Sequence, residues 1–327
     1  MRNNVLKRAI GQLEMIDFMT LVFIAVNLAY VALMRNAIAD PWPIFSGYAL
    51  CLAFTLLVIA GGGPERYPAP RSRSMAAVRW LQGLLRQAYP LALFAYFFMA
   101  VTRFDTALWG SDLDPYFAGM DTFLFGSVPS ARLLFEYPSF LLSELLHGAY
   151  VLYYVSIPGL AFWLYVKNRS ALREYIVVAM FIFYAACLTY AVLPVVGGRF
   201  DPAIRALTET YRYGPFTRMM VFIYRSSAHS GAAFPSTHAI MSLIIALMSI
   251  KRAKPLALLF SINAMLILAA TIYCGYHYVV DLFGAFVYLA ILYPVGLRLE
   301  RAFYRGRELR GSADDVTSSA RLPARRR

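Results

Sequence analysis

Long apolar runs separated by short polar segments recur along the whole chain. A helix needs about 20 apolar residues to cross the hydrocarbon core of a bilayer. Runs of roughly this size lie at 15–34, 43–60, 86–102, 139–166, 175–196, 235–250, 255–273 and 278–297. The run at 235–250 is short, and the run at 139–166 contains Glu144 and His147, so these two are the least regular. The pattern predicts an all-α fold, a polytopic membrane helix bundle of about eight transmembrane helices.

The composition of the 327 residues supports a membrane protein. Hydrophobic residues make up 60% of the chain, charged residues only 15%, and the mean hydropathy is +0.57. This is too apolar for an ordinary soluble domain. The net charge of +13 could indicate a nucleic-acid partner, but the basic residues are spread over short loops between apolar runs. We therefore predict no nucleic-acid partner.

Basic residues are unevenly distributed among the segments that join the runs. Cytoplasmic loops of membrane proteins are enriched in lysine and arginine. With the N-terminus placed in the cytoplasm, 23 of the 31 Lys and Arg residues, including every lysine, fall on the cytoplasmic side. The first run is long and lacks a small-residue cleavage site, which favours a retained span over a removed signal peptide. The prediction is an integral membrane protein with both termini in the cytoplasm.

Two predicted outer segments have unusual charge. Segment 103–138 is expected to lie along the membrane interface, and its aspartates are Asp105, Asp112, Asp114 and Asp121. Without a histidine or tight spacing, a solvated loop is favoured over a metal cluster, so neither a metal nor another cofactor is predicted. Segment 198–234 contains arginine but no lysine, at Arg199, Arg205, Arg212, Arg218 and Arg225. Bidentate phosphate contacts and an exposed amphipathic helix explain these arginines equally well.

A histidine and an aspartate lie four residues apart at the start of the last run. The sequence YCGYHYVVDLFGA (273–285) places His277 and Asp281 on one face of a helix. The carboxylate can bind one imidazole nitrogen and fix the tautomer, which leaves the other nitrogen able to attack phosphorus. A buried polar pair that fastens two helices explains His-x-x-x-Asp equally well.

A second polar turn precedes the run at 235–250. The sequence GAAFPSTHA (231–239) contains Pro235, Ser236, Thr237 and His238. Proline with neighbouring Ser and Thr is typical of a helix N-terminus, where backbone amides and the helix dipole favour phosphate. Taken alone, the turn could equally be an ordinary helix cap followed by an incidental histidine.

The charge-derived topology, which used neither motif, places both turns on the outer side beside the arginine-rich segment. Two histidine-bearing helix starts at one interface favour a catalytic role for His238, His277 and Asp281.

Together these motifs resemble the type 2 phosphatidic acid phosphatase superfamily, in which Pro-Ser-x-His is followed by His-Tyr-x-x-Asp between apolar spans. The similarity is greatest to the branch that includes fungal inositol phosphorylceramide synthase. It rests on AGMDTFLFG (118–126), SELLHGAYVLYY (143–154), LPVVGGRF (193–200), FPSTH and GYHYVVD. It covers about residues 103–297 and implies a six-helix phosphatase-like core.

The resemblance also implies a role for each motif residue. His277 would be the nucleophile that forms a phosphohistidine, and Asp281 would hold it. His238 would protonate the leaving alkoxide, and Ser236 would contact a phosphate oxygen.

Two motifs that are usual in the superfamily are missing from this chain. Ala270 and Thr271 stand where Ser-Arg is usual, and the lysine followed by Arg-Pro is absent. The synthase-like branch lacks these standard forms too, which favours that branch over a phosphatase of soluble substrates. Phosphate charge must then be neutralised elsewhere. Arg199 is the first candidate and Arg225, just upstream of FPSTH, is the second.

Three further polar residues lie in or beside the predicted spans of the second half. Glu144 and His147, three apart on one face of the fourth predicted span, are expected to bind a substrate headgroup or polarise an acceptor hydroxyl. A buried structural pair is the alternative. His229, in a serine-rich loop, is expected to be a surface residue.

The chain is thus expected to act on lipids within the membrane. The first hypothesis is a phosphotransferase that passes a phosphate-linked headgroup, such as phosphoinositol, from a phospholipid to a lipid acceptor. A lipid phosphate phosphatase is the alternative, and a lipid transporter is remote because no internal repeat is evident. The predicted parts are three N-terminal transmembrane helices with a basic cytoplasmic loop (1–102), the outer interfacial segment (103–138), a catalytic helix bundle (139–300) and a disordered basic cytoplasmic tail (301–327).

Overall fold

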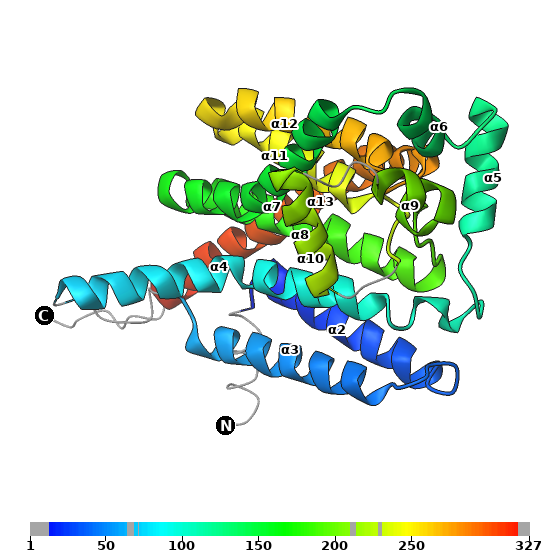
Figure 1. The fold of residues 1–327 in the computed structure, drawn as a ribbon. Helices are drawn as coiled ribbons and strands as arrows, with labels where there is room; N and C mark the ends of the chain where they lie inside the picture. The colour runs from blue at the N-terminus through cyan, green and yellow to red at the C-terminus, as the bar shows by residue number, and fades with distance from the viewer. Residues whose placement is uncertain (1–12, 64–68, 71, 210–213, 228–230, 320–327) are drawn as a thin grey trace, which may run out of the picture.

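The computed structural model describes residues 13–63, 69–70, 72–209, 214–227 and 231–319. These residues form helices joined by short connections, with no strand in the described ranges (Figure 1). The long helices are α2 (Met15–Leu33), α3 (Trp42–Gly61), α4 (Arg73–Val101), α7 (Phe140–Lys167), α8 (Arg169–Val192), α11 (Thr237–Arg252), α12 (Lys254–Tyr273) and α13 (Val279–Ser319). The shorter ones are α5 (Asp114–Phe125), α6 (Pro129–Glu136), α9 (Pro202–Glu209) and α10 (Pro215–Ser227). The all-α prediction is confirmed.

Seven helices in the described ranges are long and apolar enough to cross a membrane: α2, α3, α4, α7, α8, α12 and α13. The predicted span at 235–250 is the exception, since α11 has only 16 residues. At 1.5 Å per residue it is about 24 Å long, shorter than the hydrocarbon core of about 30 Å. Most of its side chains are buried. A helix surrounded by protein does not have to match the bilayer thickness, so α11 can begin inside the bundle.

Helix α8 lies in the middle of the bundle because it is apolar around its whole circumference. Its apolar stretch is 72% buried, the highest value among the seven candidate spans. Aromatic stacking joins it to the N-terminal helices. Phe183 stacks on Phe94 of α4 with ring centroids 3.8 Å apart, and Tyr184 stacks on Phe23 of α2 at 4.4 Å. Helices α2 and α4 therefore pack directly on the bundle that carries the motifs, and α3 packs on α2 and α4.

The two ends of the long helices differ in charge. At one end, Arg252 donates to Glu174 at 2.6 Å, and Arg173 donates to Glu300 at 3.0 Å. These ion pairs join α8 to α11 and α13, where the predicted cytoplasmic loops lie. Helix α11 runs from Ser236 at its N-cap to Arg252. The FPSTH turn therefore lies at the end opposite to these basic residues.

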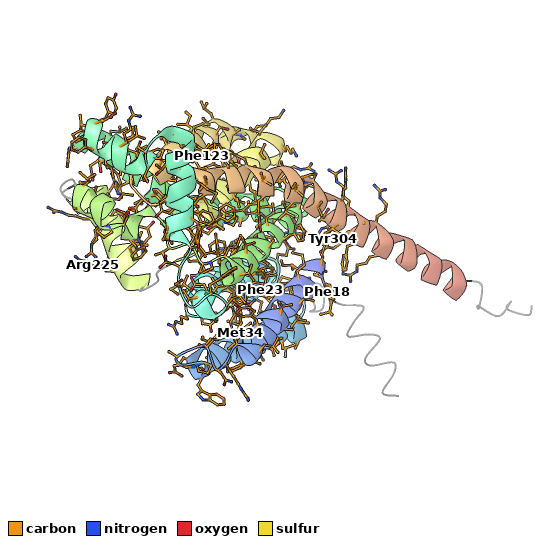
Figure 2. All side chains as sticks on the ribbon, turned by 90° about the vertical axis from the view of Figure 1, so that its right-hand side faces the viewer. Phe18, Phe23, Met34, Phe123, Arg225 and Tyr304 are labelled. Atoms are coloured by element: carbon orange, nitrogen blue, oxygen red, sulfur yellow. The ribbon has the colours of Figure 1, made fainter. Side chains whose placement is uncertain are left out.

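Helix α5 lies at the motif end and runs across the direction of the long helices (Figures 1 and 2). Its side chains fall on two contrasting faces. Phe117 and Asp121 are buried, whereas Tyr116 is 71% and Phe123 is 89% exposed. A helix with one buried face and exposed aromatic side chains is suited to a membrane–water interface.

Helix α13 continues past the predicted end of the last span. It is one helix as far as Ser319. Residues 301–319, which were expected to be disordered, are therefore helical. The first ten residues of this stretch include Ala302, Glu308, Leu309 and four arginines, which have high helix propensity. Tyr304 donates to Glu14 at 2.6 Å, and Arg307 donates to the Leu13 carbonyl at 3.2 Å. These contacts fasten the extension to the start of α2; residues 320–327 lie outside the described ranges.

Candidate active site

His277 and Asp281 form a buried hydrogen-bonded pair where α13 begins. Helix α12 ends at Tyr273, and a short turn carries the chain through His277 to Val279. His277 Nδ1 lies 3.1 Å from Asp281 Oδ2, and that oxygen also accepts from the Tyr278 amide at 3.0 Å. His277 is 4% exposed and Asp281 is fully buried. The pairing expected from the four-residue spacing is present.

This pairing determines which nitrogen of His277 can act. An ionised carboxylate only accepts hydrogen bonds, so Nδ1 carries the proton in the contact with Asp281. Nε2 of the neutral ring then holds the lone pair. A ring held by a carboxylate, with its second nitrogen basic, is the arrangement of an oriented nucleophile.

Ser236 and His238 both approach Nε2 of His277. Ser236 Oγ lies 3.2 Å from Nε2, and His238 Nδ1 lies 3.4 Å from it. Ser236 is the N-cap residue of α11, and its hydroxyl accepts from the Ala239 amide. The positive end of α11 therefore points at the same place as the lone pair of His277.

Close packing between α13 and the FPSTH segment sets this approach. The Ser236 amide donates to the Asp281 carbonyl at 3.1 Å. Gly284 allows the Phe234 ring to come close, since a Cβ there would lie 2.4 Å from a ring carbon of Phe234. A larger residue at 284 would displace one of the two motif segments.

His238 lies in an aromatic surround provided by α7. Its ring centroid is 5.1 Å from that of Tyr150, 5.2 Å from Tyr153 and 6.3 Å from Tyr154. These tyrosines were not predicted as site residues. The signal was present, because Tyr150 lies three residues after His147, and Tyr153 and Tyr154 lie three and four residues after Tyr150. The rings pack around one side of His238, which keeps part of its surface exposed.

Arg199 lines the same small pocket as His277, together with Phe200, Tyr224 and Tyr276. The guanidinium carbon is 4.0 Å from the Tyr224 ring centroid and 4.5 Å from that of Phe200. Stacking on aromatic faces holds a guanidinium in place without neutralising it. The structure thus places Arg199, the first arginine candidate, in the same pocket as His277.

Arg225 lies away from this pocket. It is exposed on α10, and Figure 2 shows it at the edge of the molecule. It does not line the pocket that contains His277. His229 and Arg212 lie outside the described residues.

Glu144 binds the start of α10 instead of lining the histidine pocket. Its carboxylate accepts from the amides of Phe216 at 2.9 Å and Thr217 at 3.1 Å, and from the Thr217 hydroxyl. In the structure this carboxylate therefore makes a structural contact between α7 and α10. The carboxylate caps the helix that carries Tyr224 to the pocket.

His147 lies in a neighbouring pocket, with Ser143, Thr208 and Cys274. Its Nδ1 is 2.7 Å from the Ser143 carbonyl, which only accepts, so Nδ1 carries the proton and Nε2 is the basic atom. Tyr276 lines both this pocket and the pocket of His277. Tyr276 thus lies between the pocket of His147 and the pocket of His277.

Two aspartates of the outer segment belong to the surroundings of the site, contrary to the solvated-loop prediction. Asp121 is fully buried and accepts from the Val279 and Val280 amides. Asp114 accepts from the Val196 and Gly197 amides. Burial raises the pKa of both carboxyls above the ordinary value for aspartate. The amide hydrogen bonds act in the opposite direction but do not cancel this effect. Their seven-residue spacing places them on one helix face, a signal that the sequence contained.

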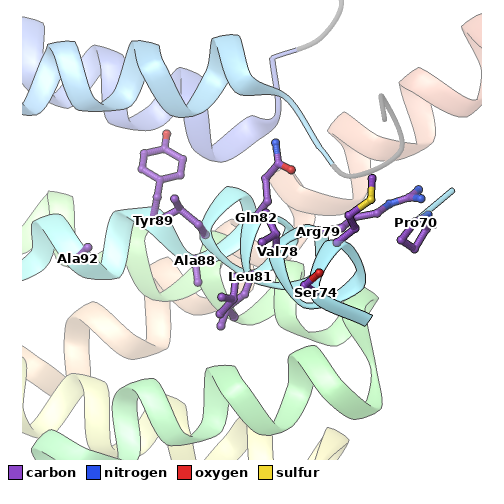
Figure 3. Close-up of a pocket in the computed structure, with 12 residues that line it drawn as sticks. Pro70, Ser74, Val78, Arg79, Leu81, Gln82, Ala88, Tyr89 and Ala92 are labelled. Carbon is purple, nitrogen blue, oxygen red and sulfur yellow. The ribbon is translucent and has the colours of Figure 1, made fainter. Parts of the chain in front are cut away.

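A larger apolar groove lies along the first half of α4 (Figure 3), lined by residues between Pro70 and Ala92. Its polar side chains include Ser74, Arg79 and Gln82. It contains none of the motif residues. The groove is therefore not part of the candidate active site.

The described helices define a polytopic membrane protein with a histidine-containing site at one end of the bundle. Residues 119–295 match the family model of the PAP2 superfamily, and the chain belongs to that superfamily. The matched region runs from α5 to α13. Members of the superfamily are typically phosphatases and phosphotransferases, so membership supports this type of activity on lipids. No curated protein and no solved structure matches the chain.

Proposed function

We propose that the chain is an integral membrane lipid phosphotransferase that works through a phosphohistidine on His277. It would move a phosphate-linked headgroup, such as phosphoinositol, from a phospholipid to a lipid hydroxyl. The observation that carries the proposal is the convergence of Ser236 Oγ and His238 Nδ1 on Nε2 of His277, whose Nδ1 is held by Asp281. Hydrolysis of a lipid phosphate by the same residues is the second candidate.

In the first step, the lone pair of His277 Nε2 attacks phosphorus and forms a P–N bond. The bond from phosphorus to the diacylglycerol oxygen breaks, and protonated His238 gives its proton to that oxygen. In the second step, the acceptor hydroxyl returns a proton to His238 as its oxygen attacks phosphorus and the P–N bond breaks. Asp281 stabilises the imidazolium character that develops on His277.

The His238 ring has to move when substrate binds. The 3.4 Å separation between the two imidazole nitrogens is a direct hydrogen-bond distance and leaves no room for an intervening phosphoryl group. His238 is only half-buried, whereas His277 is fixed by Asp281. Rotation of His238 would open the site and place its proton beside the leaving oxygen.

Transfer is favoured over hydrolysis by two features. The chain lacks the superfamily's usual Ser-Arg and Lys/Arg-Pro motifs, as the synthase-like branch does. The tyrosines of α7 also flank His238, and their rings form an apolar surface on which a lipid acceptor could lie.

A direct test uses purified full-length protein in lipid nanodiscs with a phospholipid labelled in its headgroup phosphate. We expect label on a hydroxylated acceptor lipid when the acceptor is present and little release of water-soluble phosphate. Release of free phosphate without labelled acceptor would support the phosphatase instead. No product from either reaction would overturn both.

Replacing Arg199 by glutamine is expected to lower kcat/KM for the phospholipid by about 10- to 100-fold. The reason is that phosphate loses one hydrogen bond from a charged group. Arg199→Lys should restore only part, since lysine lacks the planar fork. Arg225→Gln, on the exposed face of α10, is the matched control. Equal effects of Arg199→Gln and Arg225→Gln would contradict the assignment.

The proposed location of the site is the outer face of the membrane, with both termini cytoplasmic. The separation of the motif turns from the basic helix ends supports it. We expect Asp112→Cys to react with an impermeant thiol reagent from outside, and Lys254→Cys only after permeabilisation. The native cysteines Cys51, Cys187 and Cys274 are buried and give a low background. The reverse labelling pattern would refute this orientation.

A further inference from the structure

Helix α5 contacts the site through two carboxylates on one face. Asp121 Oδ2 accepts from the Val279 amide at 2.9 Å, and Oδ1 accepts from the Val280 amide at 3.0 Å. Asp114 lies seven residues earlier, two helical turns away on the same face. Both carboxylates bind backbone amides of segments that carry site residues.

Asp121 caps the N-terminus of α13, although it is distant from α13 in the sequence. The first amides of a helix lack partners within the helix and are usually bound by the side chain just before it. Helix α13 begins at Val279, and the residue before it is Tyr278, whose side chain has no acceptor placed for these amides. The carboxylate of Asp121 fills this place and puts negative charge at the positive end of α13.

The Val279 and Val280 amides, which Asp121 binds, lie in the turn that joins His277 to Asp281. Val279 and Val280 lie between His277 and Asp281, so the backbone that Asp121 binds sets the separation of the two site residues. A shift of this turn would move the imidazole relative to its carboxylate.

Asp114 binds the segment that leads to Arg199. It accepts from the Val196 amide at 2.6 Å and from the Gly197 amide at 2.8 Å, two residues before Arg199. It also accepts from the Tyr278 hydroxyl at 3.1 Å, next to His277. Helix α5 therefore binds both the segment that leads to Arg199 and the turn that contains His277.

We propose that Asp114 and Asp121 are positioning residues of the reaction, with α5 as a brace that holds the catalytic turn at the start of α13. The proposal rests on the proposed function of His277. Displacement of a reacting group by about 1 Å can lower a rate by about 100-fold. The brace acts on geometry, so its loss should lower kcat more than it raises KM.

The test compares Asp121→Asn with Asp112→Asn in the full-length protein in nanodiscs. Asparagine has the size of aspartate but offers an amide donor toward one of the two backbone donors, so one hydrogen bond is lost. We expect Asp121→Asn to lower kcat by about 10- to 100-fold with KM within about twofold. Asp112 is exposed, and its variant should behave as wild type.

A second readout does not depend on activity. Hydrogen–deuterium exchange of residues 277–282 should rise in Asp121→Asn and stay unchanged in Asp112→Asn. In addition, combining Asp121→Asn with Asp281→Asn should lower kcat by less than the product of the two single effects, because both act through His277. A residue that served only overall stability would give multiplicative losses.

Each outcome decides the matter. Unchanged exchange in the turn, unchanged kcat, or a rise in KM equal to the fall in kcat would overturn the positioning role. An Asp121→Asn protein that cannot be recovered folded would also overturn it, since Asp121 would then serve stability. If His277→Asn kept full turnover, the proposed function would fail, while the exchange measurement would still show whether Asp121 holds the turn.

Discussion

Replacing His277 by asparagine is expected to lower kcat for both transfer and hydrolysis by about 10⁴-fold or more. Asparagine places an N–H donor near the position of Nδ1, so the contact with Asp281 can be kept while Nε2 is lost. This choice avoids removing the side-chain partner of the buried Asp281 carboxylate, whose remaining bond is from the Tyr278 amide; that loss would destabilise the protein by about 1–3 kcal/mol. The measurement is turnover of headgroup-labelled phospholipid in nanodiscs, together with thermal unfolding.

The same protein should also lose the covalent intermediate. Wild-type enzyme that is quenched with denaturant during turnover should carry acid-labile phosphate on the chain, and His277→Asn should carry none. His229→Ala is the matched control, because that histidine belongs to neither motif. Full turnover by His277→Asn, or label that persists in it, would show that His277 is not the nucleophile.

Removal of the second histidine is expected to have an effect that depends on the leaving group. A general acid contributes about 10²- to 10⁴-fold when the departing oxygen is poor at leaving. His238→Ala should therefore lower the rate by this factor with a diacylglycerol leaving group. With a p-nitrophenyl ester of the same headgroup phosphate, the loss should be less than about 10-fold, because the phenolate leaves without a proton.

This comparison separates the two histidines. His277→Asn should lower the rate with both substrates, since the nucleophile is needed whatever the leaving group. If His238→Ala lowered both rates equally, the assignment of His238 as the proton donor would be wrong, and a role in holding Nε2 of His277 would explain its 3.4 Å contact better.

Much of the site follows from local spacing. His277 and Asp281 meet because residues four apart share a helix face. Ser236 caps α11 because a serine hydroxyl can accept from a free amide of the first helical turn. Their convergence was expected from charge counting, and the structure places them within hydrogen-bond distance. Arg199 was chosen because phosphate charge needed a partner, and it lines the same pocket.

Other assignments depended on contacts between distant segments. Glu144 was expected in the site because an ionised group in a span is costly, but its partners are the amides at the start of α10. Arg225 was expected near phosphate because it precedes FPSTH in the chain, but α10 leaves it exposed. Closeness along the chain does not determine the direction in which a helix presents each side chain.

The roles of α5 and α11 show the same division. Nothing local indicates that Asp121 binds the start of a helix 158 residues later, since that contact exists only once α5 lies across the end of the bundle. Likewise, α11 is too short for a free span and is accommodated because its neighbours bury it. Apolar periodicity, charge asymmetry and the two histidine motifs determined the helical membrane fold, the superfamily and the catalytic candidates from the sequence. The brace, the aromatic surround and the position of each arginine came only from packing, because they depend on which helix faces meet, and short-range patterns do not encode that choice.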